Sequence, residues 1–282
     1  MNSVADPVRH AEAIVRRSGT SFYWAIRFLP QKKRDAMYGV YAFCREVDDI
    51  VDEPGEHGEK CLQLGLWRGE IERLYGGNPR YPVARALVEP IERFGLDKLD
   101  FRAMIDGMEM DAGARMRIAD MDELYIYCDR VACTVGRLST RIFGLPDDVC
   151  LRLAAAQGLA LQLTNILRDV HEDAARDRLY LPLDLLSAHG IMETENLDAV
   201  LADAALPRVC KTLGDIAERK FVEARALTKQ CDQHSVRPAV MMLEVYHRIL
   251  VKLMLGGWRD VSVRVGLSRP TKLWIALRYG LI

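Results

Sequence analysis

Helical periodicity covers most of this chain of 282 residues and constrains its fold more than any other feature. Apolar residues recur three or four positions apart over long stretches, and the alternating pattern of strands is almost absent. Glycine and proline separate these stretches, as at Pro30, Pro54 and Gly144. Because no repeat or low-complexity linker divides the chain, we expect one all-α domain over residues 1–282. The pattern predicts helices at residues 7–17, 21–28, 31–52, 59–75, 81–93, 98–112, 120–143, 147–174, 207–231, 237–256 and 270–280.

The charge balance argues against a protein that binds nucleic acid. The chain has 40 acidic and 39 basic residues and a net charge of −1, whereas nucleic acid requires a strongly basic face. Half of the residues are apolar, which at this length is enough for a sizeable core. The seven cysteines form no CxxC pair, so we interpret them as the reduced thiols of a cytoplasmic protein.

The termini carry no pattern typical of membrane insertion. Residues 1–17 lack the uninterrupted apolar run of a signal peptide, and no stretch of about 18 apolar residues could span a bilayer. The segment 269–282 is both basic and apolar. We expect it to pack on the body of the protein as a terminal helix, with peripheral contact with the inner face of the membrane as the alternative.

A first acidic cluster lies in the predicted helix 31–52. Asp48 and Asp52 are four residues apart, so they share a helix face with Arg45 and Tyr41. Two carboxylates at this spacing repel each other unless a cation lies between them. Carboxylate oxygens suit Mg²⁺, which usually completes its shell with water and substrate phosphate, and Arg45 would bind that phosphate. A solvated acidic face is the alternative, and this cluster by itself does not exclude it.

A second polar stripe lies in the predicted helix 147–174. Gln162, Asn165, Asp169 and Asp173 fall on one face of a helix that is otherwise hydrophobic. Burying such groups is unfavourable unless they have partners. Internal hydrogen bonds would provide those partners, but a metal and a bound anion explain the composition better.

Two such helices facing each other would enclose a diphosphate held by Mg²⁺. A diphosphate bound in this way is a good leaving group, and the allylic cation left behind needs a long apolar cavity that keeps water out. The remaining negative charge would be neutralised by Arg45, Arg168, Arg176 and Arg178. Small residues on flanking helices could make room for a long chain, although close helix packing explains each of them equally well: Ala132, Cys133, Gly136, Ala154, Ala155, Ala156, Gly158 and Ala160.

These motifs resemble those of the squalene/phytoene synthase family over most of the chain. The similarity includes the segments 21–30, 41–52, 106–111, 127–136, 162–173 and 178–182. Two acidic motifs at this separation and with these flanks are highly specific for that family. The segments 236–242 and 272–281 are most similar to those of bacterial members that act in hopanoid biosynthesis.

The resemblance implies a helical bundle of the isoprenoid-synthase type around a central cavity, with more than one Mg²⁺ ion. The implied metal ligands are Asp48, Asp52, Asn165 and Asp169, with Asp173 on the same wall. The implied substrate contacts are Ser18, Ser21, Arg45, Gln162, Arg168, Arg178 and Tyr180. As catalytic residues we expect Tyr41, Arg45, Asp48, Asp52, Tyr127 and Asp169.

The implied reaction is the head-to-head condensation of two farnesyl diphosphates to presqualene diphosphate plus diphosphate. One substrate loses its diphosphate, and the cation closes a cyclopropane on the double bond of the other. A tyrosine or the released diphosphate would take the final proton. The resemblance implies no NADPH for this step, and it implies downstream isoprenoid enzymes as partners. The sequence departs from the family at His171, Asp177 and Cys133, where glycine is usual, which affects the local backbone geometry.

Other functions remain open. Phytoene synthase, using two geranylgeranyl diphosphates, or a dehydrosqualene or squalene synthase would share these motifs. A chain-elongating prenyl synthase would explain the Asp48-Asp49-x-x-Asp52 motif, but it would usually carry a second aspartate-rich motif. A di-iron bundle needs two Glu-x-x-His units, and only Glu244 to His247 provides one. The last alternative is a non-catalytic assembly factor that keeps the fold.

Overall fold

Helices make up nearly all the regular structure of the residues that a computed structural model describes, which are 6–18 and 22–280. In chain order they are α1 (Pro7–Arg17), α2 (Phe22–Arg27), α3 (Gln31–Asp52), α4 (His57–Tyr75), α5 (Pro82–Ala86), α6 (Val88–Phe94), α7 (Lys98–Asp111), α8 (Met121–Cys128), the π-helix η1 (Asp129–Cys133), α9 (Thr134–Phe143), α10 (Asp147–Ala174), α11 (Leu183–Ala188), α12 (Leu197–Ala202), α13 (Leu206–Thr228), α14 (Arg237–Gly256) and α15 (Arg269–Gly280). The strands β1 (Met116–Arg117) and β2 (Arg178–Leu179) pair in parallel. The predicted all-α fold is confirmed.

The long helices follow their predicted bounds closely, and the differences have local causes. The predicted helix 81–93 divides after Ala86, because Pro90 has no N–H with which to continue the ladder to that carbonyl. Gly144 ends α9 with φ of 79°, a left-handed conformation that glycine adopts without strain. The prediction missed α11 and α12, since six residues are too few for a periodic signal.

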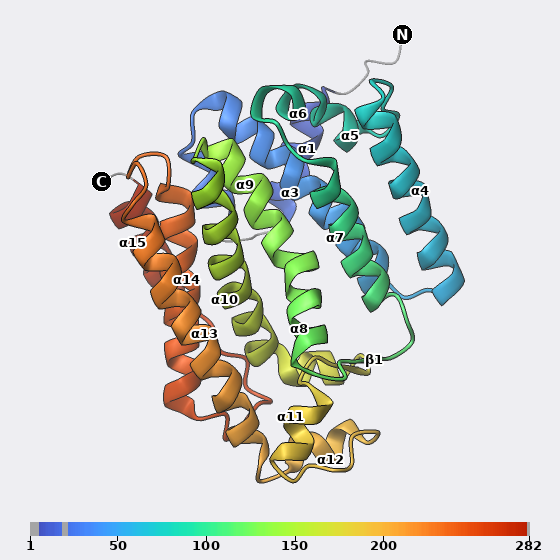
Figure 1. The fold of residues 1–282 in the computed structure, drawn as a ribbon, viewed down its shortest axis with the longest axis vertical. Helices are drawn as coiled ribbons and strands as arrows, with labels where there is room; N and C mark the ends of the chain where they lie inside the picture. The colour runs from blue at the N-terminus through green and yellow to red at the C-terminus, as the bar shows by residue number, and fades with distance from the viewer. Residues whose placement is uncertain (1–5, 19–21, 281–282) are drawn as a thin grey trace.

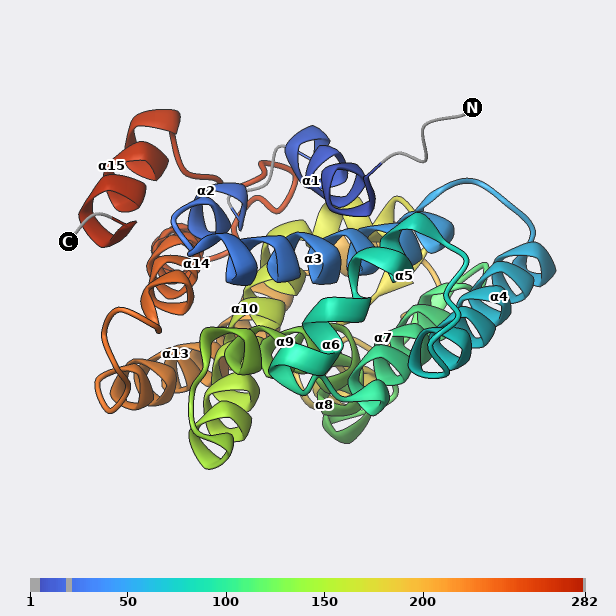
Figure 2. The same ribbon diagram turned by 90° about the horizontal axis from the view of Figure 1, so that it is seen from above.

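The helix α10 lies at the centre of the bundle. It packs against α13 and α14 on one side and against η1 and α9 on the other, as Figure 1 shows. The helix α3 lies across the far side of α9 and α10, and α4 and α7 continue the bundle beyond it (Figure 2). The core of the described residues is continuous from Ala11 in α1 to Ile275 in α15. The single domain over residues 1–282 stays a prediction, and no described helix has the length and apolarity needed to cross a membrane.

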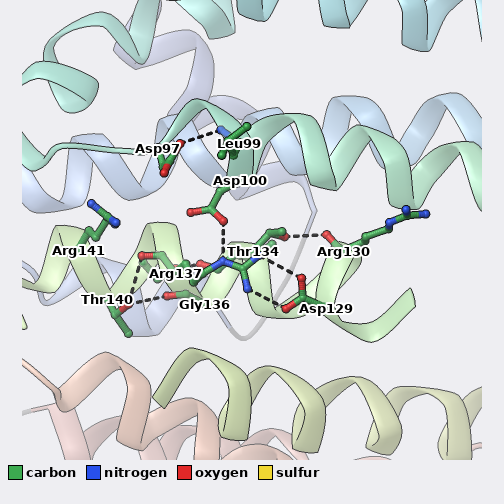
Figure 3. Close-up of polar contacts among 12 residues, drawn as sticks. Asp97, Leu99, Asp100, Asp129, Arg130, Thr134, Gly136, Arg137, Thr140 and Arg141 are labelled. Atoms are coloured by element: carbon green, nitrogen blue, oxygen red, sulfur yellow. Dashed lines mark hydrogen bonds and ion pairs between the residues drawn. The ribbon is translucent and has the colours of Figure 1, made fainter. Parts of the chain in front are cut away.

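A partly buried ion-pair network holds the π-helix η1 in place. The Arg137 guanidinium lies between Asp100 of α7 and Asp129 of η1, and one of its N–H groups donates to Asp129 Oδ1 over 2.7 Å (Figure 3). The Asp100 side chain is only 9% exposed, so removing Arg137 would leave its charge buried without a partner, which is destabilising. A π-turn in a helix is often found at a functional site, and Val131 and Ala132 of this turn point into the cavity described next.

Candidate active site

A cavity of about 280 Å³ lies between α3, α9, α10 and α14, with α2 and η1 completing its wall. The helix α3 contributes side chains from Met37 to Asp48 at helical spacing, so one stripe of the helix faces the cavity. The helix α10 does the same from Leu153 to Asn165. The fold therefore confirms the prediction that these two helices converge on one space.

The cavity changes character along its length. Arg45, Asp48 and Asn165 lie at one end, and apolar side chains such as Met37 and Phe143 lie at the other. Asp48 follows Met37 by eleven residues, which corresponds to about 16 Å along α3 at the usual helical rise. We call these two regions the polar end and the apolar end of the cavity.

The small residues of the sequence divide between lining the cavity and allowing close packing. Ala132, Gly136, Ala154 and Gly158 all line it. Gly158 also allows close packing, because a Cβ there would lie only 2.8 Å from the Cys133 sulfur. Of the other small residues considered, Cys133, Ala156 and Ala160 are buried in packing and Ala155 is exposed. Sequence could not separate these roles, because both require a small side chain.

The first acidic cluster contains one carboxylate that is fully paired and one that is not. Asp52 accepts a hydrogen bond of 2.8 Å from Arg178 and lies 3.2 Å from Arg176. Asp48 lies 3.3 Å from Arg45, which it shares with Asp49. Burial, and then the nearby Asp52 carboxylate, raise the pKa of Asp48 to about 6, although Arg45 opposes the rise. Asp48 therefore lies where its charged form is disfavoured, although Arg45 is close to it.

The second cluster repeats this arrangement. Asp169 accepts hydrogen bonds from Arg168 over 2.8 Å and from Arg264 over 3.0 Å. Burial, and then the charge of Asp169, raise the pKa of Asp173 to about 7. The Asn165 amide donates to Gln162 over 3.4 Å, but its buried Oδ1 has no hydrogen-bond partner among the described residues. Such an orphaned acceptor is rare in native proteins and indicates that something else binds there.

The segment after α10 connects the two clusters. Arg178, in β2, binds Asp52 of α3, and its charge also opposes the pKa rise of Asp173 in α10. The adjacent Asp177 has φ of 57°, and Arg117 of β1 donates to its carbonyl over 2.8 Å. The parallel β1–β2 pair therefore fixes the arginines where the two acidic clusters meet.

Two of the predicted tyrosines share one buried aspartate. Tyr127 donates to Asp111 Oδ2 over 2.9 Å, and Tyr180 donates to Asp111 Oδ1 over 2.6 Å. Their rings stack with centroids 4.9 Å apart. Burial raises the pKa of Asp111, and the hydrogen bond from Tyr180 and the charge of Arg178 oppose the rise. Neither tyrosine is among the residues that line the cavity.

The other predicted site residues fall into three groups. Tyr41, Arg45, Asp48, Gln162 and Asn165 line the cavity. Asp52, Arg168, Asp169, Asp173 and Arg178 surround its polar end through the ion pairs and electrostatic contacts described above. Ser18 accepts a hydrogen bond of 3.1 Å from the Tyr41 hydroxyl, and Ser21 lies outside the described residues. The catalytic, substrate-binding and metal-binding roles of all these residues stay predictions.

Sequence reasoning missed two residues at the polar end. Tyr246 of α14 is a half-buried residue that lines the cavity, and its pKa is raised by loss of hydration while Arg168 opposes the rise. Arg264 binds Asp169 from an irregular segment after α14, where no periodicity gives a signal. Tyr246 lies inside the Glu-x-x-His unit that suggested a di-iron site. In the fold Glu244 pairs with Arg225 over 2.8 Å and His247 with Glu218 over 2.9 Å, so both ends of that unit bind α13.

The residues that replace family glycines are accommodated in different ways. His171 is exposed, Cys133 is buried, and Asp177 adopts the left-handed conformation in which glycine is favoured. Among the described residues, no three His, Cys, Asp or Glu side chains form a group that could hold a metal by themselves. Mg²⁺ does not require such a group, since it is usually bound by one or two carboxylates together with water and substrate phosphate.

Comparisons with known proteins agree with this geometry. A model of the squalene/phytoene synthase family matches residues 15–271. Presqualene diphosphate synthase of Rhodopseudomonas palustris is 42% identical over 100% of this chain and 99% of its own length. A dehydrosqualene synthase solved with a ligand superposes with a TM-score of 0.83 at 26% identity, over 97% of this chain and 95% of that one. A squalene synthase of Alicyclobacillus acidocaldarius superposes with a TM-score of 0.78 at 29% identity, over 89% and 95%. As its motifs predict, this chain belongs to the squalene/phytoene synthase family.

Proposed function

We propose that this protein condenses two farnesyl diphosphates head to head, producing presqualene diphosphate and releasing diphosphate. The observation that carries the proposal is the orphaned Oδ1 of Asn165, a residue that lines the polar end of the cavity together with Asp48, while most of the cavity is apolar. An oxygen-rich end and an apolar end match the two parts of a prenyl diphosphate. The presqualene diphosphate synthase that is similar to this chain along its whole length supports this choice of product.

The donor set at the polar end fits Mg²⁺, and we expect more than one ion. Asp48 and Asp52 would hold metal from α3, while Asn165, Asp169 and Asp173 would hold it from α10. Hard oxygen donors are the ligands that Mg²⁺ prefers, and burial raises the pKa values of Asp48 and Asp173, so a bound cation would favour their charged forms. When bound, the metal supplies positive charge that stabilises the departing diphosphate.

The residues of the chain would then position the reactants. Arg45 would exchange part of its contact with Asp48 and Asp49 for phosphate oxygens, and Arg178 would do so from the other side. The apolar side chains of the cavity keep water from the allylic cation until a carbon–carbon bond forms. The cation adds to the second substrate's double bond, and loss of one proton closes the cyclopropane. Tyr41, whose hydroxyl donates to Ser18, is the proton acceptor candidate inside the cavity, with the released diphosphate as the alternative.

Incubation with farnesyl diphosphate and Mg²⁺, followed by mass analysis of the products, tests the proposal. We expect a C30 diphosphate ester containing a cyclopropane, formed equally well with and without NADPH and not formed when a chelator removes the metal. Formation of a C40 product from geranylgeranyl diphosphate, with no turnover of farnesyl diphosphate, would identify a phytoene synthase instead. A requirement for isopentenyl diphosphate would identify a chain-elongating enzyme.

The cysteines indicate the cellular compartment of the protein, and the product indicates which enzymes act after it. All seven cysteines are free thiols, which fits a reducing compartment, so we place the protein in the cytoplasm. Its product keeps one diphosphate and two prenyl chains. The enzymes that act next on such a product, by removing the remaining diphosphate, are the partners we expect downstream.

A further inference from the structure

One face of the protein combines exposed aromatic and apolar side chains with basic ones. Phe28, just after α2, is 42% exposed, and Trp274 and Leu277 of α15 are 50% and 48% exposed. The helices α2 and α15 contact each other at one edge of the molecule, as Figure 2 shows. Together with the exposed Arg27 and Arg278, these side chains define what we call the α2/α15 face.

The charge of this face is positive. The two helices that form it, Phe22–Arg27 and Arg269–Gly280, contain four basic residues, Arg27, Arg269, Lys272 and Arg278, and no acidic residue, although the chain as a whole is close to neutral. Arg248 of α14 lies over the Trp274 ring, with its guanidinium carbon 5.0 Å from the ring centroid. Exposed tryptophan beside arginine is the composition of proteins that rest in the headgroup region of an anionic bilayer. Acidic phospholipid headgroups would complement the charge, and the acyl boundary would cover Phe28, Trp274 and Leu277.

The same two helices separate this face from the cavity. Ala25 and Ile26 of α2 line the cavity, whereas the next residues, Arg27 and Phe28, are exposed. Tyr279 of α15 packs on the small cluster formed by Ala25 and two methionines of α14. Only the thickness of a short helix therefore lies between the apolar interior and the proposed lipid surface. This position suits a site whose ligands carry long apolar chains.

We infer that the α2/α15 face docks on an anionic lipid bilayer. The docking itself does not depend on the proposed function, because it rests on the exposed side chains and the charge of this face. Burial of Trp274 and Leu277 in the interface provides the apolar part of the binding free energy, and the basic residues provide a part that salt screens.

Sedimentation of the full-length protein with vesicles tests the inference. We expect binding to vesicles that contain phosphatidylglycerol, weaker binding at high salt, and little binding to pure phosphatidylcholine. Replacing both Trp274→Ser and Leu277→Ser should lower the affinity for phosphatidylglycerol vesicles by at least about tenfold. The matched control is Leu62→Ser with Leu66→Ser on α4, where the side chains are 66% and 50% exposed and the affinity should not change.

A second pair of variants keeps the test decisive if the first pair disturbs the packing of α15. Arg27→Glu with Arg278→Glu reverses two exposed charges and loses only their local contacts with Tyr23 and Tyr279, and it should lower the affinity for phosphatidylglycerol vesicles by about tenfold or more. Failure of the native protein to sediment with phosphatidylglycerol vesicles at low salt would overturn the inference. An equal loss of binding in the α4 control would overturn it as well. Neither measurement requires turnover, so a negative result with farnesyl diphosphate leaves this test unaffected.

Discussion

The two ends of the cavity are built from the same helices but differ in how completely the protein satisfies its own groups. At the apolar end, the hydroxyls of Ser139 and Thr140 donate to backbone carbonyls of their own helix over 2.7 and 2.9 Å. Phe143 is buried there among other apolar side chains. At the polar end, Asn165 Oδ1 has no partner among the described residues, and Asp48 lies in a site that disfavours its charge.

Because of this difference, we expect the apolar end of the cavity to stabilise the fold and the polar end to bind a ligand. A protein often loses stability where its active site is arranged for a charged ligand and a cation. We therefore expect substitutions at the polar end to abolish activity at little cost in stability. At the apolar end we expect the opposite, namely a loss of stability and a change in which substrate fits.

The largest effect should follow Asp48→Asn at the polar end. The substitution keeps the shape but removes a negative charge, so metal binding and diphosphate departure should fail, and the condensation rate should fall by about 10²–10³-fold or more. Thermal stability in the absence of metal should stay the same or rise, because the charge of Asp48 is disfavoured in the fold. Product formation and melting temperature provide the two measurements.

Asp49→Asn is the matched control for that experiment. Asp49 is adjacent in sequence and also pairs with Arg45, but it does not line the cavity. Its loss should therefore reduce the rate far less than the loss of Asp48. Equal losses of rate in the two variants, or unfolding of Asp48→Asn, would contradict a division between a reactive polar end and a stabilising apolar end.

The next effect should follow Phe143→Leu at the apolar end. The shorter side chain leaves space where the prenyl chain would end, so the rate with geranylgeranyl diphosphate relative to farnesyl diphosphate should rise by about tenfold. The free energy of unfolding should fall by roughly 2 kcal/mol, because about three buried carbons are lost. Competition between the two substrates measures the first change, and urea unfolding measures the second.

Phe221→Leu removes the same atoms from the fully buried core at α13, away from the cavity. It should lower stability by a similar amount and leave the substrate preference unchanged. A shift in preference in both variants would show that softening of the core, and not the length of the cavity, controls which substrate fits.

The sequence predicted the polar end better than the walls around it. Asp48 and Asn165 each belong to a stripe on one long helix, and helical periodicity determines which residues share a face. The bounds of α3 and α10 agree with the prediction, so each stripe faces as expected. We could predict that the two helices converge, because each carries polar groups that need a partner.

Residues brought in by tertiary contacts gave no comparable signal. Tyr246 lies on α14 between the buried Val245 and the ion-paired His247, and Arg264 lies in an irregular segment whose path depends on how α14 ends. Asp111 belongs to the family segment 106–111, but the hydrogen bonds that it accepts from Tyr127 and Tyr180 join three separate parts of the chain. Such contacts depend on packing between distant parts of the chain, which no local pattern specifies.

The buried carboxylates of the polar end should make the stability of the protein depend on pH. Burial raises the pKa of Asp48 to about 6 and that of Asp173 to about 7, both above the ordinary value of 3.8. Their protonated forms are therefore favoured by folding, and the stability that they contribute is present below about pH 4 and lost as the pH rises through 6 and 7. Because the Asp48 side chain is 40% exposed, solvent screens part of its effect, and we expect a change of about 1 kcal/mol.

Melting curves between pH 5 and 8 without divalent cations measure this loss, and Asp48→Asn should reduce it. Adding Mg²⁺ with diphosphate should reduce it as well, because a bound cation favours the charged carboxylates. A loss that is the same in the native protein and in Asp48→Asn would assign the pH dependence to groups outside the polar end.

The smallest effect concerns the backbone that holds Arg176 and Arg178 over the polar end. Asp177 between them has φ of 57°, where a side chain is strained and glycine is not. Asp177→Gly and Asp177→Ala both lose the ion pair with Arg117, but only the alanine variant keeps a Cβ in this conformation. The alanine variant should therefore be less stable than the glycine variant by about 1 kcal/mol, which urea unfolding can resolve. Equal stabilities would mean that the backbone after α10 adopts another conformation at no cost in free energy. A rigid backbone could then not be what positions Arg176 and Arg178 at the polar end.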